Sequence, residues 1–380
     1  MKEAEGNEVG EVRGDERPRR RGKWWILLVA ILLAVASIWA VATFSFGQRG
    51  VGEQLRAMAG KSGFYKEEVL GPGWYAKLAD KYKLPARRQP VRFFSQTVTD
   101  EDMAVVGRAI TLDAVGLDDS QISDAGMAHL KGLTKMQRLY LNNTKIGDAG
   151  LAHLSELTEL RILRLSGTKV SDAGMTHLEG LAKMEALVLS NTKIGDAGLT
   201  HLEGLTKLQI LHLDNTRIGD AGLAHLSELT ELRILHLDGT KVSDAGLVHL
   251  KKFKNLHSLS LNDTEVTDEG LAQLCGFWNL SYLDLGSTQA TDKGLVHLNT
   301  NLRRLSLNGT GVTDEGLAQL SGFGGLFYLD LGGTQVTDAG LVHLKSLKRL
   351  NTLVLSGTRV TSEGIADLKS ALPNVKVDFE

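Results

Sequence analysis

Leucines recur along most of the chain with a period of 24 residues. Segments 123–146 and 147–170 read SDAGMAHLKGLTKMQRLYLNNTKI and GDAGLAHLSELTELRILRLSGTKV. The register continues to Val360 with one two-residue deletion, a degenerate copy precedes it at 99–122, and a partial copy follows at 361–380. A period of this length predicts a repeat array, here of eleven repeats and a terminal half-coil.

Each repeat combines two hydrophobic patterns. Leu139 and Leu141 stand on either side of a polar or variable position, and this alternation predicts a short strand with one face inward. Leu151, Leu154 and Leu157 follow at three-residue spacing and mark the buried face of a helix. A single coil cannot bury its leucines alone, so we expect successive coils to stack on one another.

Two polar columns also recur. A threonine follows each strand, and we expect its buried hydroxyl to bond backbone groups of the turn and of the neighbouring coil. An aspartate opens each helix, and we expect Asp148 or Ser171, for example, to cap free N–H groups there. The threonines are Thr144, Thr168, Thr192, Thr216, Thr240, Thr264, Thr288, Thr310, Thr334 and Thr358. The aspartates are Asp124, Asp148, Asp172, Asp196, Asp220, Asp244, Asp268, Asp292, Asp314 and Asp338.

These motifs resemble bacterial leucine-rich repeats, particularly the 24-residue T-x-[VI]-[TSG]-D-x-G-L-x-H-L subtype, which is akin to ribonuclease-inhibitor-like repeats. The resemblance covers residues 99–380, about three-quarters of the chain. It implies an α/β fold, a curved parallel β/α horseshoe with its strands on the concave side. The function that it implies is protein binding, which is the property that the family shares.

An uncharged run of 23 residues, 24–46, reads WWILLVAILLAVASIWAVATFSF. As a helix it would measure about 35 Å, enough to cross a hydrocarbon core of about 30 Å. Six Lys and Arg residues lie between Arg13 and Lys23, against three from the end of the run to Lys61. This bias predicts a single-pass signal anchor in the plasma (inner) membrane, with the tail 1–23 cytoplasmic and the repeats outside the cytoplasm.

A cleaved signal peptide is the alternative to this anchor. Ala40-Val41-Ala42 has the small-x-small form of a signal-peptidase site, and cleavage after Ala42 would release the mature protein. The long polar leader favours an uncleaved anchor, and both interpretations export the repeats. Residues 47–98 are expected to form a spacer and N-terminal cap, in which 73–84 has the spacing of a short amphipathic helix.

Composition and motifs give no indication of catalysis. The net charge of −2 creates no global field that would favour nucleic acid. The single cysteine, Cys275, cannot form an internal disulfide, and its helix position predicts exposure. No nucleophile motif, Walker loop, dinucleotide loop or H-E-x-x-H sequence occurs. We therefore expect no enzyme activity, no cofactor and no small-molecule substrate.

A column of histidines on the helices raises the question of a metal. Gln273 and Gln319 hold the same position in two repeats, and Gln is a poor ligand for transition metals, so we expect hydrogen bonding between coils instead. The aspartate column supplies one carboxylate per coil, too few for calcium. The array should therefore fold without a metal. The histidines are His129, His153, His177, His201, His225, His249, His297 and His343.

The positions that flank the first strand leucine are not needed for the core and are free to carry function. The predicted partner-binding residues on the concave face are Arg138, Tyr140, Ile162, Arg164, Val188, Ile210, His212, Ile234 and His236. The predicted basic edge is formed by Lys145, Lys169, Lys193, Arg217 and Lys241. Repeats 147–170 and 219–242 differ at only two positions, Arg164/His236 and Ser166/Asp238, and both lie on this face.

These observations favour a membrane-anchored, non-catalytic scaffold. Exposed Ile, Val, Tyr and Arg side by side are typical of an interface, and the basic edge favours a protein partner with an acidic rim around an apolar core. Two alternatives to this scaffold remain. In the first, the array is a rigid spacer whose length matters more than its surface. In the second, the chain is an accessory or sensor subunit of a membrane enzyme.

Overall fold

The computed structural model describes residues 64–69 and 88–379. The predicted tail 1–23, the predicted anchor 24–46 and the helix expected at 73–84 lie outside the described residues. Within the described ranges, no helix combines the length and the apolar character needed to cross a membrane.

One sheet of 14 strands runs through the described part, with its strands in sequence order. β1 pairs antiparallel with β2, and each later pair of neighbours is parallel. The strands are β1 (Phe64–Val69), β2 (Arg88–Phe94), β3 (Leu112–Gly116), β4 (Arg138–Tyr140), β5 (Ile162–Arg164), β6 (Ala186–Val188), β7 (Ile210–His212), β8 (Ile234–His236), β9 (Ser258–Ser260), β10 (Tyr282–Asp284), β11 (Arg304–Ser306), β12 (Tyr328–Asp330), β13 (Thr352–Val354) and β14 (Lys376–Asp378).

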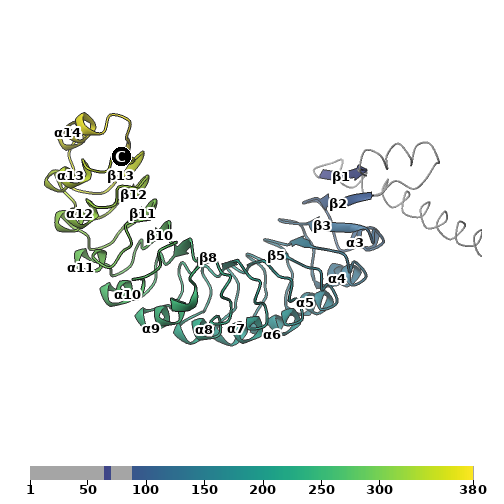
Figure 1. Cartoon of the computed structure of the whole chain (residues 1–380). Coiled ribbons are helices and arrows are strands. Elements are labelled where there is room, and N and C mark those ends of the chain that lie inside the picture. Colours follow the sequence, from purple (N-terminus) through teal and green to yellow (C-terminus); the bar gives the residue numbers. More distant parts are fainter. Residues whose placement is uncertain (1–63, 70–87, 380) are drawn as a thin grey trace, which may run out of the picture. The chain divides into compact units, whose positions relative to one another are not determined.

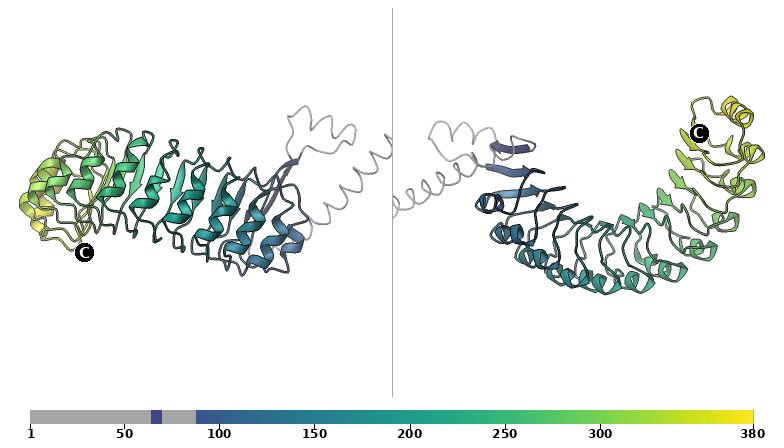
Figure 2. Two further views of the ribbon diagram at one scale, coloured as in Figure 1. Left: turned by 90° about the horizontal axis from the view of Figure 1, so that it is seen from below. Right: turned by 180° about the vertical axis from the view of Figure 1, so that it is seen from behind.

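Short helices lie on the other side of the coils. Figures 1 and 2 show the strands of the array on its inner side and the helices on its outer side, so the predicted parallel β/α solenoid is confirmed. The α-helices are α3 (Met103–Val106), α4 (Asp124–Met127), α5 (Asp148–Leu151), α6 (Asp172–Met175), α7 (Asp196–Leu199), α8 (Asp220–Ala224), α9 (Asp244–Leu247), α10 (Asp268–Gln273), α11 (Asp292–Leu295), α12 (Asp314–Leu320), α13 (Asp338–Leu344) and α14 (Ser362–Ala371). The 3-10 helices are η1 (Ala128–Leu130), η2 (Ala152–Leu154), η3 (Thr176–Leu178), η4 (Thr200–Leu202) and η5 (Val248–Lys252).

The segment predicted as a spacer contributes two strands for which the sequence pattern gave no indication. β2 continues the sheet by pairing with β3, the strand of the degenerate first repeat. β1 then adds to the edge of β2. The parallel sheet therefore begins before the first recognisable repeat.

The repeated leucines form one continuous core. Leu139 and Leu141 of the strand segment are fully buried, as are Leu151, Leu154 and Leu157 of the next helical segment. The same buried cluster extends along the array from Val98 to Val375. The leucine pattern therefore predicted the core correctly, and stacking removes from water the apolar surface that a single coil would expose.

The aspartate column joins neighbouring coils and does not cap its own helices, so that prediction was wrong. Asp148 is the first residue of α5, and its carboxylate accepts hydrogen bonds from the N–H and the hydroxyl of Ser171 in the next coil, at 2.7 and 2.6 Å. The N-cap is the residue before the aspartate, because its extended backbone lets a side chain turn back toward the helix. Thr267, for example, accepts from the N–H of Glu269, whereas Ser171 makes no such bond.

Glycine and threonine residues at fixed repeat positions make further contacts in the coils. A Cβ atom added to Gly222 would lie 2.5 Å from Oδ1 of Asp196 in the preceding coil, so the aspartate can approach only because this position is glycine. Thr216 is buried, and its hydroxyl donates to the carbonyl oxygen of Leu213 at 2.6 Å. The predicted bond to the turn is confirmed, and it stays within one coil.

Candidate functional site

The outward strand positions of β4 to β8 form one continuous surface, which we call the concave strip and define as the nine predicted partner-binding residues. Parallel pairing sets Tyr140 beside Arg164, and in the same column Val188, His212 and His236 follow on successive strands. Arg138, Ile162, Ala186, Ile210 and Ile234 form the second column in the same register. The structure therefore brings the predicted residues together.

Polar contacts organise the N-terminal end of the concave strip. The guanidinium of Arg138 lies 3.0 Å from a carboxylate oxygen of the buried Asp113. The guanidinium of Arg164 lies over the ring of Tyr140, 5.0 Å from its centroid. Arg138 is thus held by an ion pair that the repeat pattern did not indicate, because Asp113 lies in the degenerate first repeat.

The middle of the concave strip is apolar, and its border is basic. Ile162, Val188, Ile210 and Ile234 are half-buried, with part of each side chain open to the inner side of the array. The five residues of the predicted basic edge, Lys145 to Lys241, are all exposed. Backbone hydrogen bonds between successive coils, such as that from the N–H of Lys169 to the carbonyl oxygen of Ile146, hold the basic edge in register with the array.

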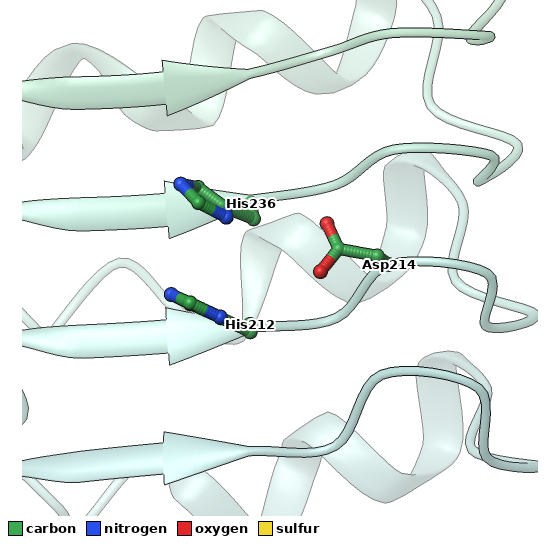
Figure 3. Close-up of side chains that lie close together, drawn as sticks. All are labelled: His212, Asp214 and His236. Carbon is green, nitrogen blue, oxygen red and sulfur yellow. The ribbon is translucent and has the colours of Figure 1, made fainter. Parts of the chain in front are cut away.

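At its C-terminal end the concave strip contains a cluster of imidazole and carboxylate groups. The rings of His212 on β7 and His236 on β8 are stacked, with centroids 4.2 Å apart and an interplanar angle of 16°. Asp214 lies beside them, just past the end of β7 (Figure 3). One potential ligand atom from each of the three residues lies within 4.8 Å of the other two.

The surroundings of the histidine pair set its charge. Burial and, to a smaller extent, the neighbouring His236 lower the pKa of His212 to about 4, while the carboxylate of Asp214 opposes the shift. At neutral pH the His212 ring is therefore uncharged and has a free lone pair. Burial raises the pKa of Asp238, and the nearby carboxylates of Asp214 and Asp284 act in the same direction.

A second aromatic and charged group lies farther along the same face. The guanidinium of Arg304 lies over the rings of Tyr282 and Tyr328, at 5.8 and 4.6 Å from their centroids. The Tyr282 hydroxyl donates to Asp284 at 3.4 Å, and burial raises its pKa to about 12. A hollow of about 560 Å³ next to this group is lined by Arg303, Arg304, Gly325, Phe327 and Arg349. None of these five lining residues is among the nine predicted partner-binding residues.

The helix histidines contact acidic side chains of neighbouring coils at two positions. Nδ1 of His201 lies 2.6 Å from Glu179, and Nδ1 of His225 lies 2.9 Å from Glu203. Both pairs link successive coils, so the hydrogen bonding predicted for this column is confirmed at two of its eight histidines. Cys275 is exposed, as predicted.

Three solved structures of bacterial proteins are similar to this chain to different degrees. An internalin (inlF) from Listeria monocytogenes matches with a TM-score of 0.61 and 23% identity, over 86% of this chain and 93% of its own. A Listeria internalin C2 matches with a TM-score of 0.45 and 27% identity, over 56% and 84% of the two chains. A leucine-rich-repeat protein from Leptospira interrogans matches with a TM-score of 0.48 and 19% identity, over 73% and 80%.

The first of these likenesses concerns the fold alone, and the search of curated proteins finds no match. The family model described as "Leucine-rich repeat region" matches residues 116–375, well over half of the chain. Its match coincides with the stacked coils and the leucine core. The chain therefore belongs to the leucine-rich-repeat family.

Proposed function

We propose that this chain is a membrane-anchored, non-catalytic scaffold that binds a protein through the concave strip, with the repeats held outside the cytoplasm. One observation carries the binding hypothesis. Neighbouring strands set apolar, aromatic and arginine side chains side by side on a surface that the leucine core does not use. Leucine-rich-repeat domains are in general protein-binding modules, which supports the same function.

The chemistry of the concave strip indicates the kind of partner. Five parallel strands, β4 to β8, lie about 4.8 Å apart and give a surface roughly 20 Å long. Half-buried Ile and Val side chains at its centre suit an apolar segment, and Tyr140 and Arg164 suit directional contacts. The exposed basic edge favours a partner with an acidic rim around that apolar segment.

The anchoring part of the proposal depends on residues 24–46, an uncharged run of 23 residues with a basic flank on its N-terminal side. A reporter that is active only outside the cytoplasm, fused after Glu380, should be active. Activity of a cytoplasm-only reporter at the same place would contradict export. A mature N-terminus at Thr43 would leave export intact and remove the anchor.

The binding hypothesis is tested by crosslinking and capture from native membranes with a triple variant, Tyr140→Ala, Arg164→Ala and Ile210→Ala. None of the three side chains belongs to the leucine core, so the variant should fold. If these residues are anchors, capture of the partner should weaken by several kcal/mol, on the order of the effects seen for interface hot spots. Charge reversal of the basic edge should mainly slow association and flatten its salt dependence.

A matched control removes exposed apolar surface from the helical side. Val248→Ala, Val296→Ala and Val342→Ala together truncate side chains that are exposed on or beside α9, α11 and α13. This control should capture the partner as well as the wild type does. Equal capture by the concave triple variant would contradict the proposed site and would favour the rigid-spacer alternative or the Tyr282–Tyr328 half of the array.

A further inference from the structure

We propose that His212, Asp214 and His236 form a binding site for a divalent transition-metal ion of the Zn²⁺ class. The histidines and aspartates of the helices gave no indication of a metal. In the strand column, however, two histidines lie on adjacent strands next to a carboxylate. The site does not depend on the proposed scaffold function.

The set of donor atoms suits this class of ion. Imidazole nitrogen together with carboxylate oxygen is a common ligand set for Zn²⁺ and for other late first-row divalent ions. Three protein ligands leave one position of a tetrahedron for water. Such an incomplete shell is typical of Zn²⁺ sites that are open to a further ligand.

Binding requires the side chains to move closer together and the two imidazole rings to rotate. Two donors that each lie about 2.1 Å from one ion can be at most about 4.2 Å apart, and the three donor atoms here all lie within 4.8 Å of one another. The rings are stacked only 16° from parallel, so they must rotate substantially about their side-chain bonds before both in-plane lone pairs can point at one ion. His212, Asp214 and His236 are only half-buried, so these rotations do not disturb the leucine core.

Neighbouring groups hold the carboxylate in place. The hydroxyl of Ser190 donates to Oδ2 of Asp214 at 2.7 Å, and the N–H of Asp238 donates to Oδ1 at 3.2 Å. A carboxylate has about four lone-pair sites, so Asp214 can keep these bonds and still bind an ion. Outer-shell bonds of this kind orient the ligands of metal sites. On the histidine side, the hydroxyl of Ser258 lies 3.5 Å from Nε2 of His236.

The local charges favour a cation. The carboxylates of Asp214 and Asp284 both act electrostatically on the carboxylate of Asp238, so acidic groups gather at this end of the concave strip. Arg164 is the cation that acts on His212, and it opposes metal binding. The balance of fixed charge therefore attracts a divalent ion.

The other coils show that the fold does not require these three side chains. Coil 147–170 matches coil 219–242 at all but two positions and has Arg164 where the latter has His236. At the position of His212 the preceding coil has Val188, and at the position of Asp214 it has Ser190. The variants His236→Arg, His212→Val and Asp214→Ser thus place residues that the array already accommodates in the same columns.

The test is calorimetric titration of the full-length chain, first treated with a chelator, with Zn²⁺ alone. The wild type should bind one strong equivalent. His212→Val and His236→Arg should each weaken that binding by about 100-fold or more, since loss even of an outer-shell partner costs 10- to 100-fold. Asp214→Ser should weaken it by at least about 10-fold. Circular dichroism melts should show that each variant is folded.

The double variant His201→Ala and His225→Ala is the matched control, because it removes the imidazole–carboxylate pairs of the helical side. It should retain the strong equivalent. Co²⁺ should give visible absorption bands of a nitrogen- and oxygen-ligated ion in the wild type and in this control, and should lose them in His236→Arg. Absence of a strong equivalent in the wild type would overturn the proposal. Strong binding that is retained in His212→Val and His236→Arg, or that is lost only in the control, would also overturn the proposal.

Discussion

Replacing Asp220 with alanine should destabilise the array more than the same change at Asp196. Oδ1 of Asp220 accepts from the N–H of Ser243 at 2.8 Å, and Oδ2 accepts from its hydroxyl at 2.6 Å. Asp196 faces Gly219, which offers only its N–H, at 2.7 Å. The two aspartates otherwise match, because each is the first residue of its helix and each is half-buried.

The magnitude follows from the number of bonds. A hydrogen bond to a charged group contributes about 1.5–3 kcal/mol, and partial exposure places these near the lower limit. Loss of two bonds in Asp220→Ala should therefore cost about 2–4 kcal/mol, and loss of one in Asp196→Ala about 1–2 kcal/mol. The interaction of each carboxylate with its own helix dipole cancels in the comparison, since both stand at the same helix position.

Urea unfolding followed by circular dichroism would measure the two losses of stability in the full-length chain. Because the stability of a repeat array is close to a sum of coil and interface contributions, hydrogen exchange at the Ser243 and Gly219 amides should locate each loss at its own interface. Asp220→Asn keeps an oxygen that can accept the Ser243 N–H bond and should fall between alanine and wild type. Equal losses at Asp220 and Asp196, or losses below about 0.5 kcal/mol at both, would refute the inter-coil role of the aspartate column.

Four further changes test other columns. Gly222→Ala should destabilise the array by about 1–3 kcal/mol in urea unfolding, because its Cβ would meet Asp196 at 2.5 Å. Gly180→Ala meets nothing within 4 Å and should be neutral or stabilising by about 0.4–1 kcal/mol. Thr216→Val removes the hydroxyl bond to the turn carbonyl and should lower the urea midpoint by the equivalent of about 1–2 kcal/mol. Since the pKa of His212 in the folded chain, about 4, lies below its unfolded value, the folded state binds fewer protons between about pH 6.5 and 4. In metal-free buffer, stability should therefore fall as the pH drops through that window, and His212→Val should reduce the loss; an unchanged pH profile of the urea midpoint in that variant would contradict the shift.

The leucine pattern was sufficient to predict the coils, but it did not predict the orientation of polar side chains. A 24-residue period with alternating leucines identifies a strand and a helical segment in each coil, because burial dominates both. The same pattern cannot say which way a polar side chain turns. Asp148 was therefore expected to cap its own helix, whereas its carboxylate accepts hydrogen bonds from the next coil. β1 and β2 carry no leucine repeat, so nothing in the periodicity indicated that they extend the sheet.

The concave positions could be assigned from alternation, but their contacts with one another depend on register. Arg138 was correctly placed in an outward column, yet its ion pair with Asp113 depends on a neighbour from the degenerate repeat. The stacked pair His212 and His236 was visible as two histidines 24 residues apart, with Asp214 two residues after the first. The helix histidines are far more numerous, and the prediction that the array needs no metal depended on them and on the helix aspartates.

The near-copies within the array indicate how such a scaffold acquires a site. Leucine, threonine, glycine and aspartate columns carry the stacking, and each bonds or packs within its coil or to the next one. A strand-face residue can therefore change without loss of the fold, as Arg164 and His236 illustrate in coils that are otherwise almost identical. Parallel pairing then sets each new side chain beside the same column of the next coil, about 4.8 Å away. In coil 147–170, Arg164 lies over the ring of Tyr140, and in coil 219–242, His236 is stacked on His212. A single substitution at an equivalent strand position therefore replaces a cation–π contact with a candidate pair of metal ligands.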